Sequence, residues 1–249
     1  MTIIASEIDR FNRLSATWWN SAGPMRPLHV INELRLGYLR QLISERFDCA
    51  GPSKLEGLRI LDVGCGAGLL CEPLARSGAQ VTGIDAAAKN VGAARSHATS
   101  RGMTIDYRVG DPAGALRPDE RFDVVLLLEV VEHVADVEAF LMAAARHVAP
   151  GGLLVASTID RTWKSFAVAI VGAEYVFRVL PRGTHDWRRF VRPSELESAA
   201  GRAGLARIDL RGMRYLPVMH RASWVPDTSV NYVAAFARAD VTPPRFTRP

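Results

Sequence analysis

Short apolar segments alternate with segments of helical periodicity through the middle of the chain. The apolar segments are rich in Val, Ile and Leu and are bounded by glycine or charged residues, which is typical of buried strands. We expect such strands over residues 57–63, 79–84, 103–109, 121–128 and 153–158. Between them, apolar residues recur at every third or fourth position, and we expect helices over 69–76, 88–99 and 136–148.

This alternation predicts an α/β fold with a doubly wound, mostly parallel sheet. Two further strands, expected over 205–210 and 229–237, bring the sheet to seven strands. A helix near residues 8–14 and another over 31–47, separated by a turn-rich linker at 23–28, precede the sheet. We expect one domain over 1–240, divided into a helical N-terminal arm (1–50), a core (55–158), a helical cap inserted after the fifth strand (160–192) and a C-terminal helix with strands (193–238), followed by a flexible tail (240–249).

Composition narrows the class of protein. The chain has 249 residues, 48% of them apolar, which is enough for one sizeable core. It contains no apolar run long enough to span a bilayer, and its first residues lack the pattern of a secretory signal. The three cysteines, Cys49, Cys65 and Cys71, show no metal-type spacing, so we expect a cytoplasmic protein without disulfides. A net charge of +5 permits an anionic partner, but no aromatic and basic surface module predicts nucleic-acid binding.

The strongest local signal is a glycine-rich loop between the first strand and the helix after it. Gly64, Gly66 and Gly68 follow Asp62 at alternate positions, so the backbone can turn tightly and a ligand can approach the main chain. Asp85 ends the next strand, where its carboxylate can accept hydrogen bonds from two ribose hydroxyls. The pattern therefore predicts a nucleoside site.

The glycine spacing indicates which nucleoside derivative binds. Dinucleotide sites space their glycines as G-x-G-x-x-G around a pyrophosphate, and this loop does not. Asp62 so close to the ligand suits a cationic amine, which S-adenosylmethionine provides together with a sulfonium and a ribose. The alternative is a tight turn that binds no ligand, and the position of Asp85 argues against it.

A second group of polar residues follows the fourth strand. Glu129 and Ser157 are expected at the same sheet edge as the aspartates, because ligands bind outside the carboxyl ends of parallel strands. On a helix, Glu129, Glu132 and His133 would share one face. Methyl transfer needs an aligned acceptor that has lost its proton. The three residues could hold a divalent cation that lowers the acceptor pKa, or Glu132 and His133 could act as base and orienter, or the segment could be purely structural.

Two apolar features lie outside the predicted sheet. Trp18 and Trp19 are adjacent in the N-terminal arm, where they either cover a small-molecule cavity or fix the arm by packing. The segment 163–192 combines apolar and aromatic residues with several cations. It is interpreted either as a contact with an anionic membrane surface or as a cap over the active site.

The motifs carry a resemblance to known families. The segments at 61–68, 81–85, 129–134 and 150–152 resemble the class I S-adenosylmethionine-dependent methyltransferases. A narrower resemblance, to the ubiquinone-biosynthesis O-methyltransferases, covers about residues 7–237 and rests on the segments 26–38, 157–165, 171–175, 180–187 and 230–232. That family methylates 2-polyprenyl-6-hydroxyphenol and demethylubiquinol. The resemblance implies the same activity here, peripheral association with the inner membrane and contact with a ubiquinone-biosynthesis complex.

The resemblance also implies roles for individual residues. It assigns Arg35 to the methionine carboxylate, Gly64 and Asp85 to the donor, and Leu128 to the adenosine. It assigns Glu129, Glu132 and His133 to a divalent cation, usually magnesium.

The chain departs from the family pattern at Asp160, which replaces an asparagine, and at 110–114, where Asp111 is the candidate for the adenine contact. The alternatives are a methyltransferase for another small phenol or carboxylate, which would not need the apolar segment, and a non-catalytic scaffold, which would not need the intact glycine loop.

Overall fold

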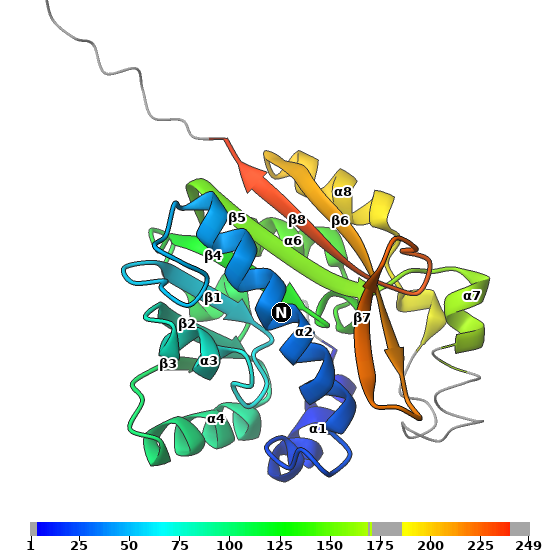
Figure 1. Ribbon diagram of the computed structural model, residues 1–249, viewed down its shortest axis with the longest axis horizontal. Helices are drawn as coiled ribbons and strands as arrows, with labels where there is room; N and C mark the ends of the chain where they lie inside the picture. The colour runs from blue at the N-terminus through cyan, green and yellow to red at the C-terminus, as the bar shows by residue number, and fades with distance from the viewer. Residues whose placement is uncertain (1–3, 169, 171–185, 240–249) are drawn as a thin grey trace, which may run out of the picture.

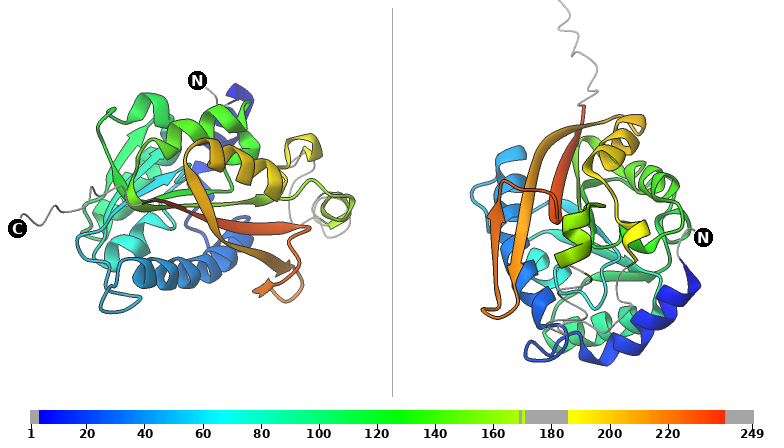
Figure 2. Two further views of the ribbon diagram at one scale, coloured as in Figure 1. Left: turned by 90° about the horizontal axis from the view of Figure 1, so that it is seen from above. Right: turned by 90° about the vertical axis from the view of Figure 1, so that its right-hand side faces the viewer.

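A single mixed sheet forms the centre of the molecule, with helices on both of its faces (Figures 1 and 2). The computed structural model describes residues 4–168, 170 and 186–239. The strands are β1 (Arg59–Val63), β2 (Gln80–Asp85), β3 (Asp106–Val109), β4 (Phe122–Leu128), β5 (Val148–Ile159), β6 (Leu205–Leu216), β7 (Arg221–Val225) and β8 (Asn231–Arg238). They are ordered β3-β2-β1-β4-β5-β8-β6-β7, with β1 to β5 parallel and the last three antiparallel to their neighbours.

The helices of the described residues divide between the two faces of the sheet. They are α1 (Ala5–Leu14), α2 (Arg26–Arg46), α3 (Cys71–Arg76), α4 (Ala88–Ser100), α5 (Pro112–Ala115), α6 (Val137–Ala145), α7 (Trp163–Ser165) and α8 (Pro193–Arg202), with 3-10 turns η1 (Ser15–Thr17), η2 (Val131–His133) and η4 (Trp187–Arg189). Residues of α2, α3 and α4 are buried against one face, and residues of α6 and α8 against the other. The left view of Figure 2 shows α2 and α8 on opposite sides of the strands.

The strands are apolar on both faces because helices cover both. Along β4, Val124 and Leu126 belong to the core beneath α2, whereas Val125 and Leu127 belong to the core beneath α6 and α8. All four side chains are fully buried. This explains why the central strands are continuous apolar runs rather than alternating ones.

The strand order places a ligand site between β1 and β4. From β1 the chain continues outward to β2 and β3, then returns to place β4 on the other side of β1. The loops after β1 and β4 therefore diverge at this point, which is where doubly wound sheets leave a crevice outside the carboxyl ends of their strands. Gly64 and Glu129 are the first residues of these two loops.

The structure differs from the sequence prediction at several boundaries. Within the described residues the sheet has eight strands rather than seven, because β7 pairs antiparallel with β6 at the edge. Its residues are mostly half-buried, so they lack the apolar pattern of the central strands. Helix α2 begins at Arg26, inside the predicted linker, since Pro27 fits the first turn of a helix. The helix predicted over 136–148 ends at Ala145, and β5 begins at Val148.

The predicted cap falls only partly within the described residues. Thr162 caps α7 through its side chain, which accepts a hydrogen bond from the Ser165 N–H at 3.0 Å. Residues 169 and 171–185 lie outside the described part of the chain, as does the predicted tail at 240–249. Among the described helices, none has both the length and the apolar character needed to cross a bilayer.

Candidate functional site

A pocket opens at the carboxyl ends of β1, β2 and β4, where the switch in strand order predicts one. The strand-end loops, α2 and the N-terminal arm together form its wall. Most of the site residues predicted from the sequence line it: Arg35, Asp62, Gly64, Asp85, Asp111, Leu128, Glu129 and His133. Gly66, Gly68 and Glu132 are not among its lining residues.

The glycine loop is shaped by close contacts as well as by backbone conformation. Gly64, Gly66 and Gly68 have φ angles of 74°, 55° and 84°, a region that side chains other than glycine rarely adopt. A Cβ on Gly64 would lie 2.7 Å from Val130 Cγ2, and one on Gly66 would lie 2.6 Å from Trp18 Cη2. Only glycine therefore fits at these positions, although Gly66 and Gly68 shape the loop from behind the pocket.

Asp85 connects the second strand to this loop. One of its carboxylate oxygens accepts the N–H of Gly66 at 2.9 Å, and the other accepts the N–H of Ala87 at 2.7 Å. Burial raises the pKa of Asp85, and the two backbone hydrogen bonds partly oppose that rise. The carboxylate is thus held in a fixed orientation at the pocket wall, with lone pairs left for ligand hydroxyls.

Asp62 is the more deeply buried of the two aspartates. Burial raises its pKa to about 6, although the thiol of Cys71, which donates to Oδ2 at 3.2 Å, lowers it. Among the described residues, no cationic side chain acts on the Asp62 carboxyl to offset the cost of burying its charge. It is therefore suited to binding a cationic group of a ligand.

Arg35 and Glu129 form an ion pair at the opposite wall. Only 1% of Arg35 is exposed, and its guanidinium donates to Glu129 Oε1 and, at 3.3 Å, to Asn32 Oδ1. Its Nε has no hydrogen-bond partner among the described residues. Ser157 Oγ also donates to Glu129 Oε1, at 2.9 Å. The predicted meeting of Glu129 and Ser157 at this edge of the sheet is confirmed.

The segment that follows Glu129 does not form the predicted helix face. Glu129 has a φ of 54°, and the chain then makes the 3-10 turn η2 rather than an α-helix. Glu132 is buried and accepts a hydrogen bond from Thr158 Oγ1 at 2.8 Å, and burial together with the charge of Glu129 raises its pKa to about 7. The expectation that Glu129, Glu132 and His133 share one helical face is wrong, because the left-handed residue turns the backbone.

His133 instead faces the N-terminal arm. Its Nδ1 lies 3.1 Å from Glu7 Oε2, and its ring meets Phe11 edge to face at 5.2 Å. Burial lowers the pKa of His133, but the contact with Glu7 and the charge of Glu132 raise it by more. In the neutral ring with its proton on Nδ1, on the side of Glu7, Nε2 carries the lone pair, and the raised pKa makes that nitrogen a stronger base.

The three predicted metal ligands therefore have separate sets of partners. Glu129 is held by Arg35 and Ser157, Glu132 by Thr158 and His133 by Glu7. Within the described part of the chain, no three acidic, histidine or cysteine side chains come together as a possible metal site. In this arrangement the donor set does not fit a cation.

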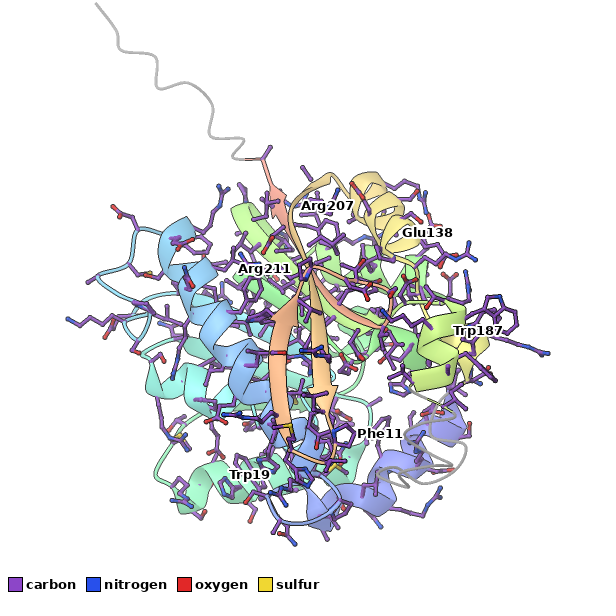
Figure 3. The ribbon with its side chains drawn as sticks, turned by 45° about the vertical axis from the view of Figure 1, so that its right-hand side comes forward. Phe11, Trp19, Glu138, Trp187, Arg207 and Arg211 are labelled. Carbon is purple, nitrogen blue, oxygen red and sulfur yellow. The ribbon has the colours of Figure 1, made fainter. Side chains whose placement is uncertain are left out.

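The sequence indicates, as one of two interpretations, that the tryptophan pair covers a cavity, and Trp18 does line the pocket. It does not indicate that other residues of the arm form part of the wall. Glu7, Ile8, Phe11, Trp18 and Leu28 all line the pocket. In Figure 3, Phe11 and Trp19 lie at the lower end of the molecule, at the opposite end from Glu138 and Arg207. The tryptophan pair and the amphipathic arm were the available signals, but neither indicates which surface the arm covers.

Comparison with known proteins identifies the class. Residues 33–210 match the methyltransferase domain family. Magnesium protoporphyrin IX methyltransferase from Synechocystis, solved with S-adenosylhomocysteine bound, is 20% identical, with a TM-score of 0.63 over 94% of this chain and 95% of that one. The N-methyltransferase NodS from Bradyrhizobium japonicum is 19% identical, with a TM-score of 0.59 over 94% and 97%. The fold is that of the class I S-adenosylmethionine-dependent methyltransferases, as predicted.

Relatives in sequence are much closer. A ubiquinone biosynthesis O-methyltransferase from Azorhizobium caulinodans is 52% identical over 93% of this chain and 92% of its own length. The protein of that name from Brucella anthropi is 49% identical over 95% and 96%. The chain belongs to the ubiquinone biosynthesis O-methyltransferase family, which confirms the resemblance seen in its motifs.

Proposed function

We propose that this protein transfers the methyl group of S-adenosylmethionine to a phenolic oxygen of a polyprenylated phenol or catechol in ubiquinone biosynthesis. Membership of the family supports the class of reaction and of acceptor. The observation that carries the proposal for the site is the placement of Arg35, Asp62 and Asp85 around one pocket.

The charges around the pocket match those of the methyl donor. Arg35 would bind the carboxylate of the methionine part, Asp62 its ammonium group and Asp85 the ribose hydroxyls. Asp111 and Leu128 are left for the adenosine end. Each assignment pairs a buried charged or polar group with a complementary one, which stabilises binding most where water is excluded.

The acceptor would lie between the donor site and the N-terminal arm. Ile8, Phe11 and Leu28 give that part of the pocket an apolar wall, and His133 provides a base on it. During transfer the bond from sulfur to methyl breaks as the bond from oxygen to methyl forms. The phenol proton would pass to His133 Nε2, leaving S-adenosylhomocysteine and the methyl ether as products. We favour His133 over Glu132 as the base, because Glu132 does not line the pocket.

The reaction is tested with purified protein, S-adenosylmethionine and a short-chain demethylubiquinol analogue. We expect the O-methylated product and S-adenosylhomocysteine in equal amounts. A protein that binds the donor but methylates only unprenylated phenols or carboxylates would support the rival substrate class. A protein that binds no donor would contradict the proposal as a whole.

The magnesium ion implied by the family is tested in the same assay. A bound cation would act as a Lewis acid that lowers the acceptor pKa. Because Glu129, Glu132 and His133 do not form a ligand set here, the proposed methyl transfer relies on His133 as the base and on no metal ion. Loss of product with chelator, restored by magnesium, would support the ion, and product formation unaffected by chelator would end that assignment.

Peripheral membrane contact through 163–192 is part of the proposal, although most of that segment lies outside the described residues. Trp163 is 77% exposed and lies beside Lys164, whose ammonium group pairs with Asp227, and Val168 is 50% exposed. Exposed apolar residues beside cations favour an anionic lipid interface. Co-sedimentation with anionic vesicles, weakened by salt, is the expected result, and wild-type protein that stays in the supernatant at low salt would contradict it.

A further inference from the structure

Trp18 connects the N-terminal arm to the donor side of the pocket. Its ring lies over Gly66, close enough that a Cβ there would meet it at 2.6 Å. The indole Nε1 donates to Asn90 Oδ1 at 3.0 Å, between residues that are 72 positions apart. Trp18 is buried and lines the pocket. The proposed reaction assigns no role to this contact.

The indole fixes the orientation of the Asn90 amide. An indole N–H can only donate, so the amide oxygen must face Trp18 and the NH₂ group must face away from it. Asn90 is 1% exposed, and its Nδ2 satisfies no hydrogen bond among the described residues. The amide nevertheless lies close enough to Asp85 to lower the pKa of that carboxyl, against the larger opposing effect of burial. A buried NH₂ group without a partner among the described residues, beside the Asp85 carboxylate, is available to donate to that carboxylate.

Trp19 holds the same loop from its other side. Its Nε1 donates to the carbonyl of Ala67 at 3.1 Å. Its ring stacks on His97 at 3.5 Å with an angle of 7° between the planes, and His97 in turn contacts the buried carboxylate of Glu72 at 2.5 Å. Trp19 therefore contacts the backbone of the loop, whereas Trp18 contacts the side chain that borders Asp85.

Building on the proposed donor site, we propose that Trp18 is a positioning residue for donor binding and acts through Asn90. The indole holds the Asn90 amide oxygen, which leaves the NH₂ group as a further donor beside the Asp85 carboxylate that the N–H groups of Gly66 and Ala87 already orient. Docking of the arm and binding of the donor then support each other, because the donor site is complete only when Trp18 is in place.

A double-mutant cycle tests this connection. Trp18→Phe removes the N–H but keeps an aromatic ring over Gly66, and Asn90→Leu removes the amide at similar volume. Titration with S-adenosylhomocysteine should show affinity reduced about fivefold to tenfold by either change, as expected for one lost hydrogen bond. If the residues act in series, the double variant should bind no more weakly than Asn90→Leu alone.

The kinetic readout separates positioning from a general structural role. We expect KM for the donor to rise in Trp18→Phe, while kcat and KM for the acceptor change less than twofold. Trp224→Phe, which changes a half-buried tryptophan of β7 that does not line the pocket, is the matched control and should leave all three constants unchanged. Equal losses in both KM values and in thermal stability, or additive losses in the double variant, would overturn the proposal.

A spectroscopic measurement avoids dependence on the variants. In protein labelled with ¹⁵N-tryptophan, the Trp18 indole N–H signal should shift when S-adenosylhomocysteine is added, with the Trp163 signal as internal reference. A Trp18 signal that stays unchanged on saturation would overturn the inference. Wild-type protein that binds no S-adenosylhomocysteine would instead contradict the proposed function, so the two failures are distinguishable.

Discussion

The buried guanidinium of Arg35 on α2 pairs with the carboxylate of Glu129 at the end of β4. Glu129 thus occupies one side of the cation that we assign to the donor carboxylate. A ligand carboxylate can use the remaining donors, including Nε, which has no partner among the described residues. Donor binding would therefore rearrange or share this pair, and the charge of Glu129 limits how tightly Arg35 holds the donor.

Arg35→Lys should weaken donor binding strongly. Lysine keeps the charge but loses the forked geometry that binds a carboxylate through two hydrogen bonds. We expect a loss of about 2 kcal/mol, or roughly 30-fold in the Kd for S-adenosylhomocysteine by calorimetry. Arg46→Lys is the control, since Arg46 lies on the same helix but binds the carbonyl of Gly151 at the surface. Equal affinities for the two variants would contradict the assignment of Arg35.

Asp85→Asn should raise the donor KM with little change in the acceptor KM. An amide oxygen cannot replace both carboxylate oxygens, which accept the N–H groups of Gly66 and Ala87. We expect a loss of about 1.5–3 kcal/mol of donor binding, measured by steady-state kinetics with each substrate varied in turn. Asp119→Asn, at a carboxylate that is 83% exposed, should change neither constant. A larger rise in the acceptor KM than in the donor KM would contradict the assignment of Asp85 to the donor.

The part of the pocket wall that we assign to the donor could be predicted from sequence because its signals are local. The glycines, Asp62 and the strand that ends at Asp85 occupy one strand–helix–strand unit, whose spacing is fixed by covalent connection. The parallel core was predictable for a similar reason, since strands buried on both faces are continuous apolar runs.

The remaining parts of the site and of the sheet depend on contacts between distant residues, which the spacing of residues in the sequence does not reveal. The spacing of Glu129, Glu132 and His133 fits a helix, and the left-handed φ of Glu129 that redirects them has no glycine or asparagine to signal it. The arm meets the pocket through contacts such as Glu7 with His133, whose partners are far apart in sequence. The edge strand β7 is half-buried and lacks a strand pattern.

Donor affinity should fall as the pH drops below about 6. Burial raises the pKa of Asp62 to about 6, and only its ionised form attracts the donor ammonium. Where the ionisation of Asp62 alone limits binding, the Kd for the donor should rise by up to about tenfold for each pH unit below about 6. Calorimetry at about pH 5 to pH 8, a range that includes the raised pKa of Asp62, measures how the Kd changes with pH. Asp62→Asn should bind the donor weakly, and its Kd should not rise in this way as the pH falls.

The same raised pKa makes the contribution of Asp62 to folding stability greatest at low pH, and that contribution is lost as the pH rises through 6.

His133→Ala should reduce kcat without reducing donor affinity. Removal of a general base costs about 10²–10⁴-fold in rate, whereas the donor contacts assigned to Arg35, Asp62 and Asp85 stay in place. His220→Asn is the control, because His220 contacts Tyr215 between β6 and β7, and asparagine tolerates its φ of 45°. Single-turnover rates with prebound donor measure the effect. A normal rate for His133→Ala would transfer the role of base to another group.

Gly64→Ala should destabilise the fold more than Gly57→Ala, although both glycines have positive φ, at 74° and 82°. At Gly57 an added Cβ meets nothing within 4 Å, so only backbone strain of about 1–2 kcal/mol is expected. At Gly64 the Cβ would also lie 2.7 Å from Val130, which adds about 1–3 kcal/mol and moves the loop against the donor. Denaturant unfolding measures the first effect, and titration with S-adenosylhomocysteine measures the second. If the two variants lose equal stability and keep equal affinity, the close approach of Gly64 to Val130 does not shape the donor site.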